Sequence, residues 1–318
     1  MPGAPALSRL RAAAGATLLA MVALPACASR PRTPDLVAPP PAFVDTFPDT
    51  VQQGSLVRAR ATTGSRVELL DAQGKATEIR VGLDGGYVLG VARDEAGPLR
   101  LRISFHPNGP GESGTTSFER EIKVLPREWK LEKIEGVPEA TVNPPPEIAA
   151  RIEREQAMVA AARTRDDDRN DYEADFAWPV QGRVSGVYGS QRIYNGTPKS
   201  PHSGLDVAAV KGTPVHAPAA GIVTLAEPDL YLTGGTVLLD HGHGVSSNFL
   251  HFSRIDVKVG QRVEKGEVLG LVGATGRATG PHMHWGMNWF GVRVDPQQLL
   301  PPPATTPAKP SSGEAPSQ

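Results

Sequence analysis

The 318-residue chain has a single cysteine, Cys27, and its positive and negative side chains almost cancel. With one thiol, no disulfide can form within the chain. The formal net charge of −1, from 33 Lys and Arg against 34 Asp and Glu, argues against nucleic acid or another strongly anionic partner. Aromatic residues are scarce (5%), whereas Gly (34) and Pro (31) are abundant. This composition favours short strands, turns and linkers over a helical bundle.

The longest apolar run near the N-terminus, "AAAGATLLAMVAL" at residues 12–24, is too short for a comfortable membrane span. It follows two arginines and ends in "LPAC", which resembles the bacterial lipobox, where a signal peptidase cuts before a cysteine that is then acylated. We therefore expect residues 1–26 to be a lipoprotein signal peptide and Cys27 to be lipidated and to anchor the protein to a membrane. Ala28 follows the cysteine, which by the sorting rule of enteric bacteria favours the outer membrane, facing the periplasm. The alternatives are an ordinary signal peptide with an incidental cysteine, or a small buried thiol at Cys27.

Composition then divides the chain into a tether and a first β module. Residues 27–44 are rich in proline and form an extended tether. Within residues 45–127, apolar-alternating runs such as "SRVELLD" and "LRLRISF" are separated by turn signals. About six such runs predict a small Ig-like β-sandwich. It contains no cluster of catalytic residue types.

A helical linker is predicted at residues 143–175, where prolines precede a stretch rich in Ala, Glu and Arg. This pattern indicates a helix of about twenty residues. Ile148, Ile152 and Val159 could pack on one face, and we expect the charged end, Arg163 to Asp175, to be a solvated connection. A second β domain follows, at 176–300, and the low-complexity tail at 301–318 is predicted to be disordered.

The second β domain holds seven of the eight histidines. In "TGPHMHWGMNWF", His282 and His284 alternate with the apolar Met283 and Trp285, the period of a strand with one face in the core. A hydrolytic zinc site needs three nitrogen or oxygen ligands, an open position and a group that moves protons. The HExxH motif of helical zinc peptidases is absent, but a strand allows His284 to bind a metal while His282 points into the same cleft. Spacing alone leaves a metal site undecided.

Three blocks carry a resemblance to a known family: "PHSGLDVAAVKGTPVHAPAAGIV", "LDHGHGVSSNFLHFS" and "VGQRVEKGEVLGLVGATGRATGPHMHW". In order and spacing they resemble the signature blocks of the lysostaphin/LytM family of zinc metalloendopeptidases. The resemblance covers about residues 178–296 and nothing before them. It implies an all-β protein whose C-terminal domain has the LytM-type β core, a duplicated hybrid motif, preceded by the Ig-like sandwich and the linker helix.

The resemblance also implies the site residues. His202 and Asp206, of H-x-x-x-D, and His284, the second histidine of H-x-H, would bind one Zn²⁺ per active site. His282 and His251 would be the catalytic residues that act on the attacking water and the oxyanion. The block around His251 reads "NFLHFS" where the family commonly has "Y-x-H-L-S", a change that keeps its aromatic and apolar character.

The activity implied is hydrolysis of peptidoglycan stem-peptide cross-links in cell-wall remodelling. The lipobox context favours the D-Ala–diaminopimelate bond, and hence a D,D-endopeptidase. The alternative is a catalytically masked or inactive LytM-type activator of cell-wall amidases, with an unknown regulatory protein partner; the five intact functional positions favour the enzyme. Of the other histidines, His241 is expected to be structural, His243 exposed and His216 without a functional role.

Overall fold

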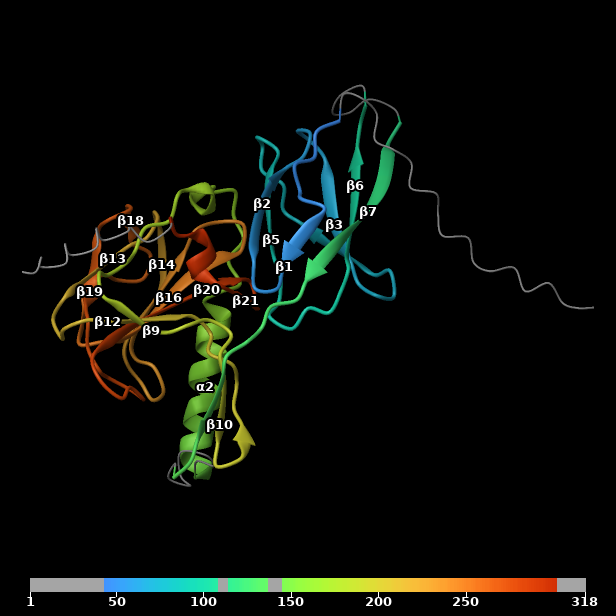
Figure 1. Ribbon diagram of the computed structural model, residues 1–318. Coiled ribbons are helices and arrows are strands. Elements are labelled where there is room, and N and C mark those ends of the chain that lie inside the picture. The colour runs from blue at the N-terminus through green and yellow to red at the C-terminus, as the bar shows by residue number, and fades with distance from the viewer. Residues whose placement is uncertain (1–42, 108–113, 137–144, 302–318) are drawn as a thin grey trace, which may run out of the picture. The chain divides into compact units, whose positions relative to one another are not determined.

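The computed structural model describes residues 43–107, 114–136 and 145–301, which all belong to one unit, Leu36–Gln318 (Figure 1). The predicted signal peptide, the lipidated Cys27 and the C-terminal tail from residue 302 lie outside the described residues. No helix in the described part of the chain is long and apolar enough to cross a membrane. Strands dominate, joined by the helix α2 (Pro146–Ala161) and the short 3-10 helices η1 (Asp171–Glu173) and η2 (Pro296–Leu299). The prediction of an all-β fold is therefore confirmed.

The six predicted strands of the first β module all form, and one more precedes them. The strands are β1 (Thr50–Gln52), β2 (Leu56–Arg60), β3 (Arg66–Leu70), β4 (Ala76–Ile79), β5 (Gly86–Gly90), β6 (Leu99–Phe105) and β7 (Thr116–Leu125), blue to green in Figure 1. One sheet has the order β1-β7-β6-β3-β4, and β2 pairs with β5 in a second. Side chains of β6 alternate between buried and half-buried, as its sequence pattern predicts. The immunoglobulin-like classification stays a prediction.

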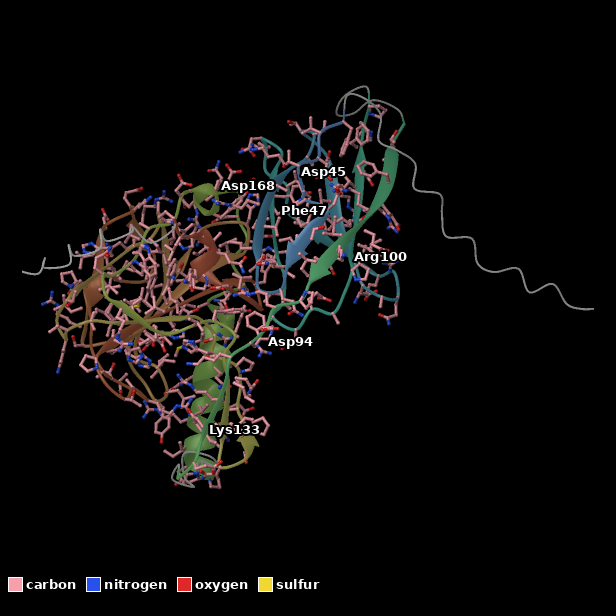
Figure 2. The ribbon with its side chains drawn as sticks, in the orientation of Figure 1. Asp45, Phe47, Asp94, Arg100, Lys133 and Asp168 are labelled. Carbon is pink, nitrogen blue, oxygen red and sulfur yellow. The ribbon has the colours of Figure 1, made fainter. Side chains whose placement is uncertain are left out.

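Buried polar and aromatic contacts hold Asp45 and Phe47, which precede β1, against the core of this module. Phe47 stacks on Tyr87 with ring centroids 6.0 Å apart. The Tyr87 hydroxyl donates to Asp45 Oδ1 at 2.8 Å, and Arg120 forms an ion pair with the same carboxylate. Asp45 and Phe47 are labelled in Figure 2. Burial and the adjacent carboxylate raise the pKa of Tyr87, so this hydroxyl stays a donor at all ordinary pH values.

An eight-stranded sheet forms the frame of the second β domain, with the order β18-β14-β15-β16-β20-β12-β9 and β21 paired to β20. Two three-stranded sheets, β13-β19-β17 and β11-β10-β8, complete it. The strands are β8 (Leu131–Ile134), β9 (Arg183–Gly186), β10 (Gln191–Tyr194), β11 (Thr197–Pro198), β12 (Leu205–Ala208), β13 (Pro214–His216), β14 (Gly221–Leu230), β15 (Gly234–Asp240), β16 (Val245–Phe252), β17 (Arg254–Ile255), β18 (Arg262–Val263), β19 (Val268–Leu271), β20 (His282–Trp289) and β21 (Val292–Val294).

The central strand β20 confirms the period-two pattern that its sequence predicts. Met283, Trp285 and Met287 are buried in the core, with Trp285 fully enclosed. β20 pairs with β16 on one side and β12 on the other, both antiparallel. Its second face therefore lies in the middle of the sheet, where residues from three strands can meet.

The helix α2 is shorter than predicted, because it ends at Ala161. Met158, Val159 and Ala162 pack against Leu225, Leu230 and Leu238 of the sheet. The burial of these apolar side chains, rather than intrinsic helix propensity, is what holds so short a helix in place.

The segment from Arg163 to Asp175 is not the solvated connection predicted from its charge. Tyr172 is 1% exposed, and Arg169 forms ion pairs with Asp171 and the buried Asp240. Charged residues in this segment thus have partners on the sheet, which the local composition could not reveal. The packed segment continues directly into Phe176, which is also buried in the core.

Candidate active site

Three predicted metal ligands converge where β12 and β20 run side by side. Asp206 is directly opposite His284 in the antiparallel register, so the two side chains share one face of the sheet. His202 precedes β12 and reaches the same point from the connecting loop. Its Nε2 atom is 3.1 Å from Asp206 Oδ1 and 3.1 Å from His284 Nδ1, and His284 Nδ1 is 2.8 Å from Asp206 Oδ1. Asp206 and His284 are buried, and His202 is half-buried.

The donor atoms of this trio suit a metal ion. His202 Nδ1 lies 2.9 Å from the Val187 carbonyl, which can only accept, so Nδ1 carries the proton and Nε2 keeps its lone pair. A tetrahedral ion with ligands at about 2.0–2.1 Å places neighbouring ligand atoms roughly 3.3 Å apart. The observed triangle, with sides of 2.8 to 3.1 Å, is close to that size. Together, His202, Asp206 and His284 could hold a metal ion.

The electrostatics of the trio also suit metal binding. Burial raises the pKa of Asp206, but the hydrogen bonds and charges of His202 and His284 outweigh it, so the pKa lies far below its ordinary value. Burial lowers the pKa of His284, although the adjacent Asp206 carboxylate opposes this shift. An anionic carboxylate and a neutral imidazole are the forms that bind metals.

Beside the trio, His251 and His282 form a second pair, with ring centroids 4.7 Å apart. His251 Nδ1 donates to the Thr275 carbonyl and His282 Nδ1 to the Gly280 carbonyl, each at 2.8 Å. In the neutral form of each ring, the lone pair is therefore on Nε2, which can act as an acceptor. His282 Nε2 lies 3.8 Å from Asp206 Oδ1, which places it at the edge of the trio. Burial lowers the pKa of His251 to about 4, so this ring is neutral at pH 7.

Several groups that shape the site were not predicted from the sequence. The Val187 and Thr275 carbonyls orient two of the histidines, and a main-chain acceptor leaves no trace in residue identity. Gly186 of β9 faces Asp206, and a Cβ atom there would lie 2.4 Å from Asp206 Oδ2. A glycine inside a strand is a signal of close approach and could have been used.

The remaining histidines of this domain lie outside the cluster of five. His241 is fully buried, with Nδ1 2.7 Å from the Ala220 carbonyl and Nε2 2.8 Å from Ser247 Oγ. The expectation that His243 is exposed is wrong, because it is 2% exposed and its ring lies 4.7 Å from that of Tyr172. The segment that was predicted to be solvated covers it. His216 donates to the Gly266 carbonyl, on a different sheet from the five.

Comparison with known proteins matches this site to one family. The model of peptidase family M23 matches residues 200–296, a range that includes all five site residues. Peptidoglycan DD-endopeptidase ShyA of Vibrio cholerae is 35% identical over 136 residues, which cover 42% of this chain and 30% of that protein. DD-carboxypeptidase/endopeptidase Mpg of Neisseria meningitidis is 41% identical over 109 residues, covering 34% of this chain and 25% of that protein. These matches thus span less than a third of either curated relative.

A solved structure matches much more of the chain. It is a Pseudomonas aeruginosa protein crystallised as a candidate peptidase M23, with 34% sequence identity and a TM-score of 0.57. The match covers 78% of this chain and 94% of that one, so it extends well beyond the domain that holds the site. On the family model, the site geometry and this similarity over most of both chains, the chain belongs to peptidase family M23.

Proposed function

We propose that this protein is a zinc-dependent peptidoglycan endopeptidase that hydrolyses stem-peptide cross-links, with the D-Ala–diaminopimelate bond as its target. The observation that carries the proposal is the convergence of His202 Nε2, Asp206 Oδ1 and His284 Nδ1 beside two histidines with free Nε2 atoms. The printed names of ShyA and Mpg, a DD-endopeptidase and a DD-carboxypeptidase/endopeptidase, support the bond class.

Zinc is the metal that fits two imidazoles and one carboxylate best. Two neutral nitrogens and one anionic oxygen leave a net positive charge and a fourth position open, which is the usual arrangement of catalytic zinc. Bound there, the ion would polarise the scissile carbonyl and make water acidic enough to ionise near neutral pH. Ser203 Oγ lies 3.5 Å from His284 Nε2, a long contact on the side of the ring that faces away from the trio.

The chain's own residues supply the proton transfers. His282 Nε2 is positioned to take a proton from the attacking water, because its Nδ1 proton is held by the Gly280 carbonyl. His251 starts neutral, with its Nδ1 proton held by Thr275, and its ring lies beside that of His282, so it can receive the proton that His282 takes from water. In that form it can stabilise charge on the substrate oxygen, and it then passes the same proton to the leaving amine. Asp206 stays anionic throughout and keeps the two ligand imidazoles aligned.

The cellular setting is part of the same proposal. A lipid on Cys27 would hold the protein at a membrane, and the lipobox context favours the outer membrane with the catalytic domain in the periplasm. The peptidoglycan layer is then within reach of a domain on the proline-rich tether. Labelling cells with a fatty-acid probe, with Cys27→Ser as the comparison, tests this part separately from the activity.

One observation favours a second candidate, a masked activator of amidases. The helix α2 packs on Leu238, which pairs in register with Asn248, and Asn248 in turn pairs with Gly286 of β20. Residues directly opposite one another on adjacent strands place their side chains on the same face of the sheet. The helix α2 therefore covers part of the face that carries the metal ligands. Shielding of this kind would leave the ligands intact and the site closed.

The test is digestion of purified peptidoglycan from a bacterium with an outer membrane, using the full chain in detergent. Mass spectrometry of the released fragments should show loss of cross-linked dimers, blocked by a chelator and restored by zinc. Asp206→Ala should abolish cleavage, whereas the matched control His216→Gln, a histidine outside the site, should cleave normally. Zinc binding without cleavage would favour the amidase activator. Absence of both would refute the enzyme.

A further inference from the structure

Arg293 lies on the same face of the large sheet as the metal ligands, further along β20. Side chains alternate along this strand, so His284, Gly286 and Asn288 point to one side. Arg293 of β21 is directly opposite Asn288 in the antiparallel register and shares that side. At about 3.4 Å per residue, Asn288 and Arg293 lie roughly 14 Å along the strand from His284.

Arg163 approaches the same place from the end of α2. It follows Ala162, which packs on the sheet with the last turn of the helix. The Arg163 Nε atom is buried and has no hydrogen-bond partner among the described residues, and the same is true of the Ser246 hydroxyl. Ser246 is directly opposite Asn288 in register, and Asn288 is directly opposite Arg293, so the side chains of Ser246 and Arg293 lie on the same face of the sheet. Two donors without a hydrogen-bond partner in the described part of the chain therefore lie near Arg293, at one end of the site face.

The two guanidinium groups lack the negative partners that other enclosed arginines have. Arg169 and Arg120 each form ion pairs with aspartates, whereas no acidic side chain among the described residues pairs with Arg163 or Arg293. Burial and, to a lesser extent, the positive charge of Arg293 together lower the pKa of Arg163 to about 10. Burial also lowers the pKa of Arg293, yet its side chain is accessible to solvent.

We propose that Arg163 and Arg293 bind a carboxylate of the peptide substrate, at a subsite about 14 Å along β20 from the metal ligands. Two cations that repel each other, one of them with a buried donor atom that lacks a partner, destabilise a fold unless an anion joins them. A guanidinium holds a carboxylate through two parallel hydrogen bonds, and the Ser246 hydroxyl can supply a third donor. The distance matches about four residues of an extended peptide, and stem peptides carry free carboxylates. The inference rests on the proposed function for the identity of the substrate.

The experiment uses the full-length zinc-loaded protein and a synthetic cross-linked stem peptide. Each free carboxylate of the peptide is replaced in turn by a carboxamide, which keeps the shape and removes the charge. One replacement should lower kcat/KM by at least about 10-fold, the usual effect of a lost charge-assisted hydrogen bond, mainly through KM. Arg293→Gln and Arg163→Gln should lower kcat/KM for the parent peptide by a similar factor. Neither substitution should change kcat/KM for the peptide whose amidation has the large effect on the wild-type protein. Arg254→Gln, an exposed arginine of the same domain, is the matched control.

Two results would overturn the subsite. One is a wild-type protein that cleaves every amidated peptide as well as the parent. The other is an Arg293→Gln protein that loses zinc, or that slows cleavage of the parent and amidated peptides equally, which indicates a structural role. If either variant fails to fold, Arg293→Lys keeps the charge, and the wild-type series remains decisive by itself.

A binding measurement separates this inference from the proposed function. Calorimetry with zinc-loaded His282→Gln requires no cleavage and reports the affinity for the parent and amidated peptides directly. If the wild-type protein cleaves nothing but this variant still discriminates between the two peptides by about 10-fold, the subsite stands and the proposed activity fails. Equal affinities for both peptides would refute the subsite whatever the activity.

Discussion

Gly186→Ala should loosen the metal site without replacing any of its three ligands. Gly186 lies opposite Asp206 across the β9–β12 pairing, where a Cβ atom would be 2.4 Å from Asp206 Oδ2 and 3.0 Å from its Cγ. Ordinary contact begins near 3.4 Å, so the carboxylate must retreat by about 1 Å. The Gly186 backbone is not in the left-handed region, so the added methyl group acts by contact alone.

The carboxylate cannot retreat freely, because Oδ1 is held by His202 at 3.1 Å and His284 at 2.8 Å. Turning Oδ2 away rotates Oδ1 out of the ligand triangle. Disturbing a group that orients metal ligands typically weakens metal binding by about 10- to 100-fold. Overpacking should also lower the free energy of unfolding of the metal-free protein by about 1–3 kcal/mol.

The assay is competition for zinc between the protein and a chromophoric chelator, alongside urea unfolding without metal. Gly291→Ala is the matched control, since a Cβ atom at Gly291 meets no atom within 4 Å and that backbone is also outside the left-handed region. Zinc affinity of Gly186→Ala equal to that of wild type would refute the argument that contact at Asp206 sets the geometry of the trio.

Three further outcomes are expected. His282→Gln should keep zinc but lose about 10²- to 10⁴-fold in kcat, and a normal cleavage rate would remove His282 from the mechanism. Leu238→Ala should lower the free energy of unfolding by about 2–5 kcal/mol in urea and free the end of α2 for proteolysis. Burial lowers the pKa of His241 from 6.5 to about 4, so between these values only the unfolded chain binds the proton and stability falls as pH falls. From pH 7 to 5 this loss should be roughly 2 kcal/mol, and His241→Gln should lack it.

The features of this protein that can be predicted from its sequence are the strands and side-chain directions that short stretches of the chain determine. The alternation in β20 identifies both its core face and the shared face of His282 and His284, because side-chain direction in a strand depends only on residue parity. The strands of the first β module follow from the same pattern. The meeting of His202 and Asp206 with His284 is non-local, and only the resemblance to a family supplied it.

The unpredicted part depends on partners that are distant in the chain. The charged stretch that contains Arg169 looks solvated until Asp240 is placed beside it, and His243 looks exposed until that stretch covers it. The strand β8 forms only because β10, about 60 positions later, offers a parallel edge. Main-chain acceptors such as the Thr275 carbonyl carry no sequence signal. The composition of a segment shows whether it could be exposed to solvent, whereas its partners elsewhere in the fold determine whether it is exposed or packed.

His251 allows the link between strain and function to be measured. Its φ is +68°, which is uncommon for a residue other than glycine and costs about 1–2 kcal/mol. The backbone is held there because the His251 N–H donates to the Thr233 carbonyl at 2.9 Å, while its carbonyl oxygen lies 2.4 Å from where a Cβ atom of Gly273 would be. The imidazole is thus aimed at His282 by a conformation that the chain would not otherwise choose.

The expected result is a reversed stability order for two substitutions. In an ordinary strand, alanine is more stable than glycine by about 0.5–1 kcal/mol. At position 251 the left-handed backbone penalises alanine, so His251→Gly should unfold at higher urea concentration than His251→Ala, measured with a chelator present. Both should be inactive, since neither has the imidazole. If His251→Ala proves the more stable, the backbone here relaxes freely, and the strain does not position the ring.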